Sequence, residues 1–206
     1  MSLMPDENHY VFGEKQSFCN YKDGKRHGRC EIYTADDKLL AYRHYEQGVF
    51  HGEFKWFHEN GNIKTHGNYE RGFLKGECTS WYDTGQLRSI TVYLQGVRHG
   101  ESVRYHHNGS MAMQGYYRFG AAHGEAKHYY GNGQLSEHSF YKDGSYHGEV
   151  KHFGDNGEIV AHDFYLNGTN VTEMIMSEIG DINNITQEEK LLIKLKWELQ
   201  CLNGDV

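Results

Sequence analysis

Residues 141–164 read YKDGSYHGEVKHFGDNGEIVAHDF, and this 24-residue pattern recurs along most of the chain. A tyrosine opens each copy, and successive tyrosines are 24 residues apart without an insertion: Tyr21, Tyr45, Tyr69, Tyr93, Tyr117, Tyr141 and Tyr165. A fixed period of this length is the signature of a repeat protein, so the fold follows from the unit. We number the units 1 to 6 from Tyr21, with a short partial seventh from Tyr165.

Further framework positions recur in every unit. Glycines follow the lead tyrosine by three and seven residues, and in most units histidine precedes and glutamate follows the second glycine. In units 2 to 6 this glycine and glutamate are Gly52, Glu53, Gly76, Glu77, Gly100, Glu101, Gly124, Glu125, Gly148 and Glu149. An aromatic residue stands twelve residues after the tyrosine, and a third glycine and an apolar residue follow it by four and six residues. Unit 1 departs most, with Arg29 in place of the glutamate and Asp37 in place of the third glycine.

Each unit carries two turn signals, represented by Asp23-Gly24 and Asn60-Gly61. Both dipeptides favour type I′ turns, which join two antiparallel strands. Each unit is therefore predicted to form one β-hairpin, joined edge to edge with the next. Two-residue turns at both places would put the lead tyrosines, second glycines and apolar column on one face, and the histidine, glutamate and aromatic columns on the other. The second glycine would then lie opposite the next tyrosine, whose ring can cover bare backbone.

The predicted fold is all-β, a single-layer antiparallel meander of six 24-residue hairpin repeats with a small C-terminal helical cap. Residues 1–17 form an N-terminal tag or edge segment, residues 18–168 the repeat array and residues 169–206 the cap. Within the cap, residues 171–180 are predicted to be a short helix. Thr186 and Glu189 form a capping box for a second helix, with an apolar stripe at Leu191, Leu195, Leu199 and Leu202. This helix would cover the last strand, or alternatively dock a partner.

The unit Tyr-x-x-Gly-x-x-His-Gly-Glu-x-x-x-aromatic-x-x-Asn-Gly-x-Leu resembles the MORN repeat in its bacterial variant form, over residues 18–168. The resemblance implies a scaffold for protein or membrane contact. Some bacterial members of this family are antitoxins of toxin–antitoxin pairs, so an antitoxin-like role is one form of the expectation.

Charge and cysteine content restrict the partners. The formal net charge of −7 argues against nucleic acid and weakens the case for anionic lipid. Cys19, Cys30, Cys78 and Cys201 show no metal-binding spacing and are expected to be reduced thiols. With no secretion signal and no apolar run near the ~20 residues of a membrane span, a cytoplasmic location is expected.

The histidines are the strongest candidates for chemistry. Equivalent histidines in adjacent units would lie ~9.6 Å apart, too far to share one zinc ion, so a repeated structural contact is the favoured interpretation. His128, His138, His152 and His162 cluster in the last two units and could bind metal adventitiously. No nucleophile, phosphate-loop or dinucleotide motif is present. The sequence therefore predicts no enzyme, no cofactor and no physiological metal site.

Binding of another protein is the better supported function, because rows of aromatic side chains supply contact area with few rotatable bonds. Specificity is expected to lie in aromatic residues outside the framework: Trp56, Tyr82, Tyr116, Tyr130, Phe140 and Phe164. The alternative is that these side chains only pack along the sheet. The predicted function is a non-catalytic protein-interaction scaffold, of which the antitoxin of a toxin–antitoxin pair is one form, with a peripheral membrane or phospholipid-binding module as the alternative.

Overall fold

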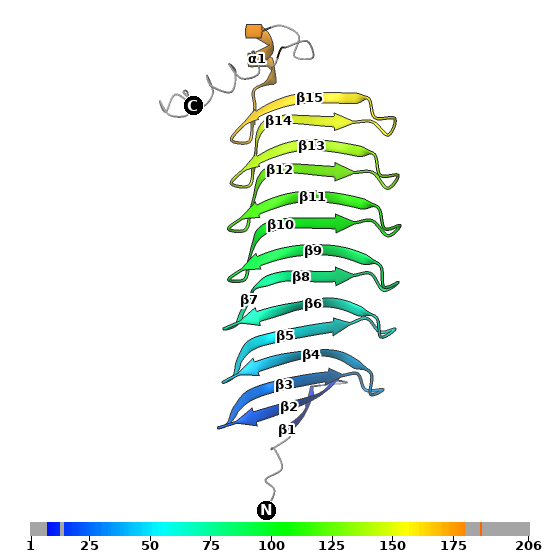
Figure 1. The fold of residues 1–206 in the computed structure, drawn as a ribbon, viewed down its shortest axis with the longest axis vertical. Coiled ribbons are helices and arrows are strands. Elements are labelled where there is room, and N and C mark those ends of the chain that lie inside the picture. The colour runs from blue at the N-terminus through cyan, green and yellow to red at the C-terminus, as the bar shows by residue number, and fades with distance from the viewer. Residues whose placement is uncertain (1–7, 13–14, 180–185, 187–206) are drawn as a thin grey trace, which may run out of the picture.

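The computed structural model describes residues 8–12, 15–179 and 186. Its strands form one open antiparallel sheet and are stacked in chain order from β1 to β15, with the short β7 and β8 both paired to β6 (Figure 1). The strands are β1 (Asn8–Phe12), β2 (Lys15–Lys22), β3 (Lys25–Tyr33), β4 (Leu39–Glu46), β5 (Val49–Phe57), β6 (Ile63–Glu70), β7 (Phe73–Leu74), β8 (Gly76–Trp81), β9 (Leu87–Leu94), β10 (Val97–Tyr105), β11 (Met111–Arg118), β12 (Ala121–Tyr129), β13 (Leu135–Lys142), β14 (Ser145–Phe153), β15 (Ile159–Leu166) and β16 (Thr169–Asn170). The predicted single-layer meander of hairpins is confirmed.

The turns along one edge of the sheet, on the left in Figure 1, are the predicted two-residue turns. In β4–β5, Glu46 pairs with Val49, which leaves Gln47 and Gly48 as the turn. Their φ angles are 50° and 87°. Positive φ at both central positions defines a type I′ turn, whose twist matches that of the flanking strands.

The connections along the opposite edge differ from the prediction. Phe57 pairs with Ile63, so the loop between β5 and β6 has five residues, not two. Within this loop Gly61 has a positive φ of 87°, whereas the φ of Asn60 is not positive. The Asn60 Oδ1 accepts a hydrogen bond from the Asn62 backbone N–H at 3.1 Å. The prediction of a type I′ turn at Asn-Gly is therefore wrong, because asparagine here acts through its side chain and only glycine adopts the left-handed conformation.

The odd-length loop changes which columns share a face. The ladder shifts by one residue beside each loop, so the apolar column pairs with the aromatic column. All six units show this pairing: Tyr33 with Leu39, Phe57 with Ile63, Trp81 with Leu87, Tyr105 with Met111, Tyr129 with Leu135, and Phe153 with Ile159. The predicted grouping of the apolar column with the lead tyrosines is therefore wrong. We call the two sides the tyrosine face and the glutamate face, after the lead tyrosines and the glutamates that follow the second glycine.

The second glycine of each unit lies opposite the next lead tyrosine, as predicted: Gly52, for example, pairs with Tyr69. Gly52 has a φ of 93°, and beside it the β4–β5 register shifts by two residues. This bulge separates the histidine and the glutamate that flank the glycine, which were expected to lie side by side on one strand face. His51 instead pairs with Glu46 at 3.4 Å, and Glu53 turns to other partners.

Three of the framework histidines contact the next two-residue turn. The Nδ1 atoms of His99, His123 and His147 lie 3.4, 3.5 and 3.4 Å from the backbone N–H groups of Phe119, Asp143 and Asn167, which donate to them. Each of these N–H groups belongs to the first central residue of a turn. The histidine therefore makes a contact between repeats, which explains a need for it in successive units.

The core lies on the tyrosine face. Tyr45, Phe50 and Tyr69 stack in sequence, with ring centroids 4.8 and 5.1 Å apart. Tyr141, Tyr146 and Tyr165 repeat this arrangement at 4.7 and 5.1 Å. In units 1 and 4 the position of Phe50 is held by arginine, and Arg98 of unit 4 lies 4.1 Å from the centroid of Tyr117. The most deeply buried side chains under these rows are Ala41, Ser139 and Val150, each 0% exposed. A single sheet thus buries small residues beneath its own aromatic rows.

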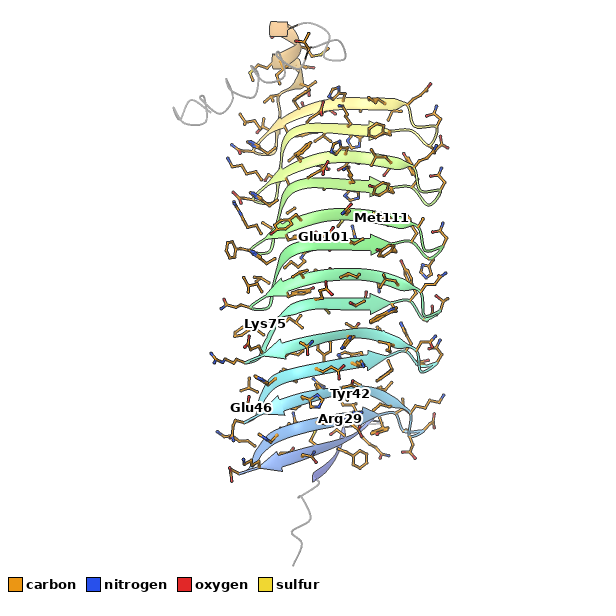
Figure 2. All side chains as sticks on the ribbon, in the orientation of Figure 1. Arg29, Tyr42, Glu46, Lys75, Glu101 and Met111 are labelled. Carbon is orange, nitrogen blue, oxygen red and sulfur yellow. A yellow bond between two sulfur atoms is a disulfide. The ribbon has the colours of Figure 1, made fainter. Side chains whose placement is uncertain are left out.

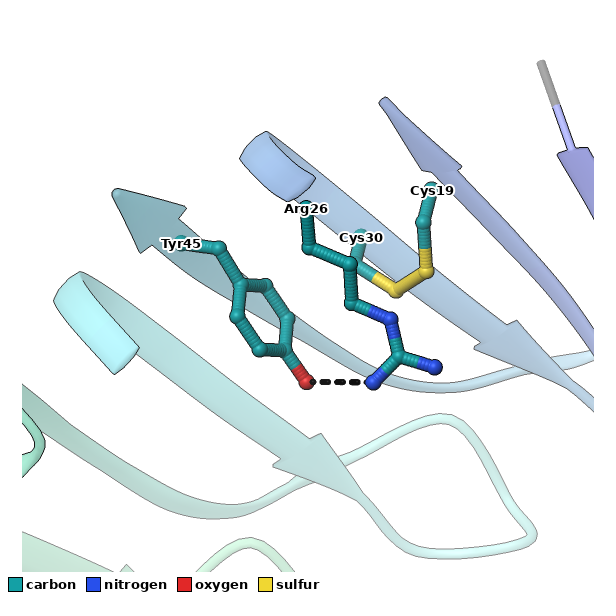
Figure 3. The surroundings of a disulfide bond; sticks show 4 residues. All are labelled: Cys19, Arg26, Cys30 and Tyr45. Atoms are coloured by element: carbon teal, nitrogen blue, oxygen red, sulfur yellow. Dashed lines mark hydrogen bonds between the residues drawn. A yellow bond between two sulfur atoms is a disulfide. The ribbon is translucent and has the colours of Figure 1, made fainter. Parts of the chain in front are cut away.

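Two of the cysteines form a disulfide. Cys19 and Cys30 are directly paired across β2 and β3 and are bonded beside Arg26 and Tyr45 (Figure 3). The prediction of reduced thiols is wrong for this pair, because cross-strand neighbours can be eleven residues apart in sequence. Cys78 is free and half-buried, and burial raises the pKa of its thiol. Disulfides persist mainly in oxidising compartments, so a bond between these two cysteines in cells would count against the cytoplasmic location, which stays a prediction.

Additional elements flank the repeats at both ends of the array. At the N-terminal end β1 pairs with β2, so part of residues 1–17 belongs to the sheet. At the C-terminal end α1 (Thr172–Ile179) confirms the predicted short helix, and its Ile175 is 4% exposed. The second predicted helix, with its stripe from Leu191 to Leu202, lies outside the described residues.

Candidate functional site

The glutamate face carries two parallel rows of side chains that run across the sheet from β3 to β15. The first row is formed by the residue after each second glycine and its partner: Arg29 and His44, Glu53 and Asn68, Glu77 and Val92, Glu101 and Tyr116, Glu125 and Phe140, and Glu149 and Phe164. We call it the acidic row. The second, or neighbouring, row lies two residues further along: Glu31, Tyr42, Lys55, His66, Thr79, Ile90, Val103, Gln114, Lys127, His138, Lys151 and His162.

In units 5 and 6 the neighbouring row neutralises the acidic row. Glu125 lies 3.0 Å from Lys127 and 2.7 Å from His138. Glu149 makes the same contacts with Lys151 and His162, both at 2.8 Å. The hydrogen bond from Lys127 is the main cause that lowers the pKa of Glu125. Burial opposes ionisation of Glu149, but its bonds to Lys151 and then His162 outweigh it and the pKa is lowered.

Unit 2 neutralises its glutamate in the same way. The Glu53 carboxylate lies 3.2 Å from Lys55 and 2.9 Å from His66, and it accepts a hydrogen bond of 2.7 Å from the Tyr42 hydroxyl. That hydrogen bond is the main cause that lowers the pKa of Glu53.

Unit 1 reverses the two charges and keeps the pair. Arg29 takes the glutamate position, Glu31 takes the lysine position, and the two lie 2.7 Å apart. Arg29 also lies over the Tyr42 ring on the adjacent strand, 3.9 Å from its centroid (Figure 2). Pairing between the two rows is thus maintained when the residue types change, so it is a structural rule of the array.

Units 3 and 4 break this rule. In place of lysine and histidine, the neighbouring row there holds Thr79, Ile90, Val103 and Gln114. Among the residues that the structure describes, Glu101 accepts one side-chain hydrogen bond, of 2.7 Å from the Gln114 amide, and the Glu77 carboxylate makes no hydrogen bond or ion pair. Both glutamates are exposed. The centre of the glutamate face therefore carries two carboxylates without a basic partner, with Val92 between them.

Exposed apolar side chains gather beside these two carboxylates. Five of them fall between residues 73 and 119, with exposed fractions of 57% for Phe73, 41% for Leu94, 42% for Val97, 45% for Tyr116 and 72% for Phe119. Phe73 pairs with Glu70 and Leu94 with Val97, which places these side chains on the glutamate face near the two-residue turns. Phe119 lies in a turn, with a φ of 48° that a bulky residue rarely adopts.

The six aromatic residues predicted to carry specificity are not brought together. Trp56 lies on the tyrosine face, 40% exposed, with Arg43 5.4 Å from its ring. Tyr116, Phe140 and Phe164 lie in the acidic row, where Phe164 is only 8% exposed next to α1. Of the six, only Tyr116 lies beside the central carboxylates.

Tyr82 and Tyr130 belong to a ladder that links successive five-residue loops. The Tyr82 hydroxyl donates to the Tyr105 carbonyl and the Tyr130 hydroxyl to the Phe153 carbonyl, both at 2.7 Å. His58 and His106 occupy the same position in other units, with Nε2 3.0 and 2.9 Å from the carbonyls of Trp81 and Tyr129. These hydrogen bonds link one repeat to the next. Tyr82 and Tyr130 therefore fit the alternative given for the six aromatic residues, in which their side chains pack along the sheet and do not bind a partner.

Sequence reasoning missed Phe73, Leu94, Val97 and Phe119. A signal was present, because polar residues such as Lys22 and Lys25 flank the corresponding turn in unit 1. A comparison of these positions from unit to unit would have found the change from polar to apolar residues. That the apolar side chains are exposed on one face could be recognised only once the strand register was known.

Other kinds of site find no support among the described residues. No group of three or more His, Cys, Asp or Glu side chains there could hold a metal ion. Three of the four clustered histidines each contact a separate glutamate: His138 contacts Glu125, His152 contacts Glu137 and His162 contacts Glu149. No helix in the described part of the chain is long and apolar enough to cross a membrane.

The fold and its surfaces define an open array of β-hairpin repeats with a fixed framework and variable surface positions. Four stretches of the chain match the family described as MORN repeat variant: 50–71, 74–95, 98–118 and 122–143. The predicted resemblance to MORN repeats is confirmed over these four repeats, which are generally modules for protein or membrane binding. The bacterial, antitoxin-like form stays a prediction. No curated protein matches the sequence.

Proposed function

We propose that this protein is a non-catalytic scaffold that binds another protein through the glutamate face of its central units. The observation that carries the proposal is the gathering of Phe73, Leu94, Val97, Tyr116 and Phe119 on one stretch of surface. Contiguous exposed apolar surface is uncommon on monomeric proteins and marks interaction sites. The tyrosine face is less suited to docking, because its aromatic rows already pack on each other and on the buried residues beneath them.

A photo-crosslinking experiment tests this proposal. A benzophenone amino acid is placed at Tyr116 on the glutamate face, at Trp56 on the tyrosine face, and at Tyr130 on the loop edge. After irradiation in cells of the source organism, we expect one protein to be crosslinked from position 116 and not from the other two. That protein, once purified, should bind the wild-type chain in calorimetry. Equal capture from all three positions, or a captured protein that fails to bind when purified, would refute the proposed surface.

The antitoxin form of the scaffold is the finer proposal, supported by the family resemblance alone. It expects a neighbouring open reading frame whose product arrests growth when expressed by itself, and it expects growth to be restored on co-expression with this chain. A neighbouring product that is harmless, or toxic irrespective of co-expression, would refute the antitoxin form and leave the scaffold standing.

Peripheral membrane binding is the second candidate, favoured by one observation: the apolar side chains of Phe73, Val97 and Phe119 lie along one edge of the sheet. The acidic row and the net charge of −7 oppose contact with anionic lipid. Flotation with vesicles of phosphatidylcholine and phosphatidylserine at physiological salt decides between the candidates, and we expect the protein to remain in the unbound fraction.

A further inference from the structure

The central units lack the cations that neutralise the acidic row in all the other units. Units 2, 5 and 6 supply Lys55, Lys127 and Lys151, and unit 1 supplies Arg29 with the charges exchanged. Units 3 and 4 instead place Thr79 and Val103 at the lysine position. The arginines nearest to Glu101 in sequence, Arg98 and Arg104, pair with Tyr93 and Ser89 and so belong to the tyrosine face. Lys75, two residues before Glu77, forms its ion pair with Glu70 instead. The chain itself therefore provides no basic partner for Glu77 on this surface among the residues described.

The residues that replace the cations are largely apolar and join the exposed apolar surface. Ile90 and Val103 are directly paired across β9 and β10, and Val92 lies in the acidic row between Glu77 and Glu101. An added methyl group at Gly100 would touch the Val92 Cβ at 3.1 Å, which shows how closely the valine covers the neighbouring strand. An apolar strip thus runs between two carboxylates and continues to Tyr116 and Leu94.

We propose that units 3 and 4 of the glutamate face bind a basic, amphipathic helix of the partner protein, whose cations replace the missing lysines at Glu77 and Glu101. This inference rests on the proposed scaffold function and names the chemistry of its partner. The two glutamates occupy equivalent positions in adjacent units, so they are two strand spacings, or ~9.6 Å, apart. A helix laid along the array presents residues i and i+7 on one face, ~10.5 Å apart. Lysine or arginine at i and i+7 therefore reaches both carboxylates, while apolar residues at i+3 and i+4 pack on Val92.

Charge complementarity favours this occupant over the others. A lipid surface rich in anionic headgroups would be repelled by the exposed carboxylates, as would nucleic acid. A second copy of this chain would bring its own Glu77 and Glu101 to the same surface, where like charges repel. A cationic amphipathic segment satisfies both the carboxylates and the apolar strip.

The test uses the full chain and a synthetic helical peptide of about 18 residues, with lysines at i and i+7 and leucines at i+3 and i+4. Binding is followed by fluorescence anisotropy of the labelled peptide at low salt. We expect saturable binding that weakens as salt is added, because exposed charge pairs are screened. A second peptide with glutamate in place of both lysines should not bind.

The decisive variant restores the pattern of the other units: Thr79→Lys, Ile90→His, Val103→Lys and Gln114→His together. These residues occupy the same positions in units 5 and 6, so the variant is expected to fold, and its circular dichroism and thermal unfolding check this. Affinity for the lysine peptide should fall about tenfold or more, because two attractive pairs are lost and two like-charge contacts are gained. Glu77→Gln with Glu101→Gln should give a similar loss, whereas Glu125→Gln, at a neutralised position, should leave affinity unchanged.

Three outcomes would overturn the inference: no binding of the lysine peptide, equal binding of the glutamate peptide, or unchanged affinity of the pattern-restoring variant. Binding of anionic vesicles that the same variant abolishes would also overturn it, in favour of lipid. Failure of the basic-helix inference can be told apart from failure of the scaffold function. A partner that is crosslinked from position 116 but has no basic helix would refute the inference and leave the scaffold function standing.

Discussion

The packing of the tyrosine face makes a sharp prediction about two glycines at the same repeat position. Gly67 pairs directly with Phe54, whose ring lies across the bare glycine backbone and packs on Tyr69 with centroids 4.9 Å apart. A Cβ added at Gly67 would lie 2.9 and 3.1 Å from two carbons of the Phe54 ring and 3.4 Å from the Cys78 sulfur. At Gly115, two repeats further along the chain, the atoms nearest to an added Cβ would be the Ala126 Cβ at 3.5 Å and the Met113 sulfur at 3.7 Å.

The two alanine substitutions should therefore change stability in opposite directions. The Phe54 ring is 4% exposed and cannot move away freely, so Gly67→Ala overpacks the face at about 1–3 kcal/mol. The smaller entropy of alanine in the unfolded chain offsets about 0.4–1 kcal/mol of that, which leaves a net loss of roughly 0–2.6 kcal/mol, with a middle value of ~1.3 kcal/mol. Gly115→Ala meets ordinary contact distances and should gain about 0.4–1 kcal/mol.

Hydrogen exchange of the backbone amides in units 2 to 5 is the suitable assay, since stability in a repeat array is a sum of local terms. Gly67→Ala should accelerate exchange in β5, β6 and β8, and Gly115→Ala should slow it in β10 to β12. Adding Phe54→Leu to Gly67→Ala should recover part of the loss, because the smaller side chain removes the close contact. If the two alanine variants behave alike, the ring contact does not limit packing and the reasoning is refuted.

Three further predictions concern charge, the disulfide and a turn. Because the pKa of Glu149 is lowered in the folded chain, its ion pairs stabilise unit 6 at pH values above the unfolded pKa of about 4.3, and this stabilisation is lost as the pH falls through the lower folded pKa. Glu149→Gln should remove this part of the acid dependence in a series of unfolding curves, and an unchanged dependence would contradict the prediction. Replacing Cys19 and Cys30 by serine should destabilise the N-terminal hairpins by roughly 2–3 kcal/mol relative to the oxidised wild type, as expected for a loop of this length. The reduced wild type is the control and should behave like the variant. Phe119→Asn should stabilise the turn by a few tenths of a kcal/mol or more and raise the melting temperature, because asparagine tolerates positive φ. A lower melting temperature would contradict this prediction. It would show that the exposed ring contributes to the fold, for instance through its ring contact with His99, whose centroid lies 4.9 Å away.

The sequence by itself determined the strand order and the type of one turn. A 24-residue period with a glycine at two fixed places leaves one economical arrangement, a hairpin per unit, because neighbours in sequence must then be neighbours in space. Dipeptides such as Asp23-Gly24 specified their turn locally, since positive φ is a property of one or two residues. The short helix at Thr172–Ile179 was likewise readable from local pattern.

Only the tertiary structure decided the faces, the cross-strand pairs and the candidate surface. The one-residue register shift beside each five-residue loop moved the apolar column, from Leu39 to Ile159, onto the face opposite the lead tyrosines. The bulge at the second glycine turned Glu53 towards Lys55 and His66 and away from His51. Because side chains alternate with a period of two, a shift of one residue reverses which columns meet. The register therefore had to be known before Glu77 and Glu101 could be recognised as the carboxylates that lack a basic partner.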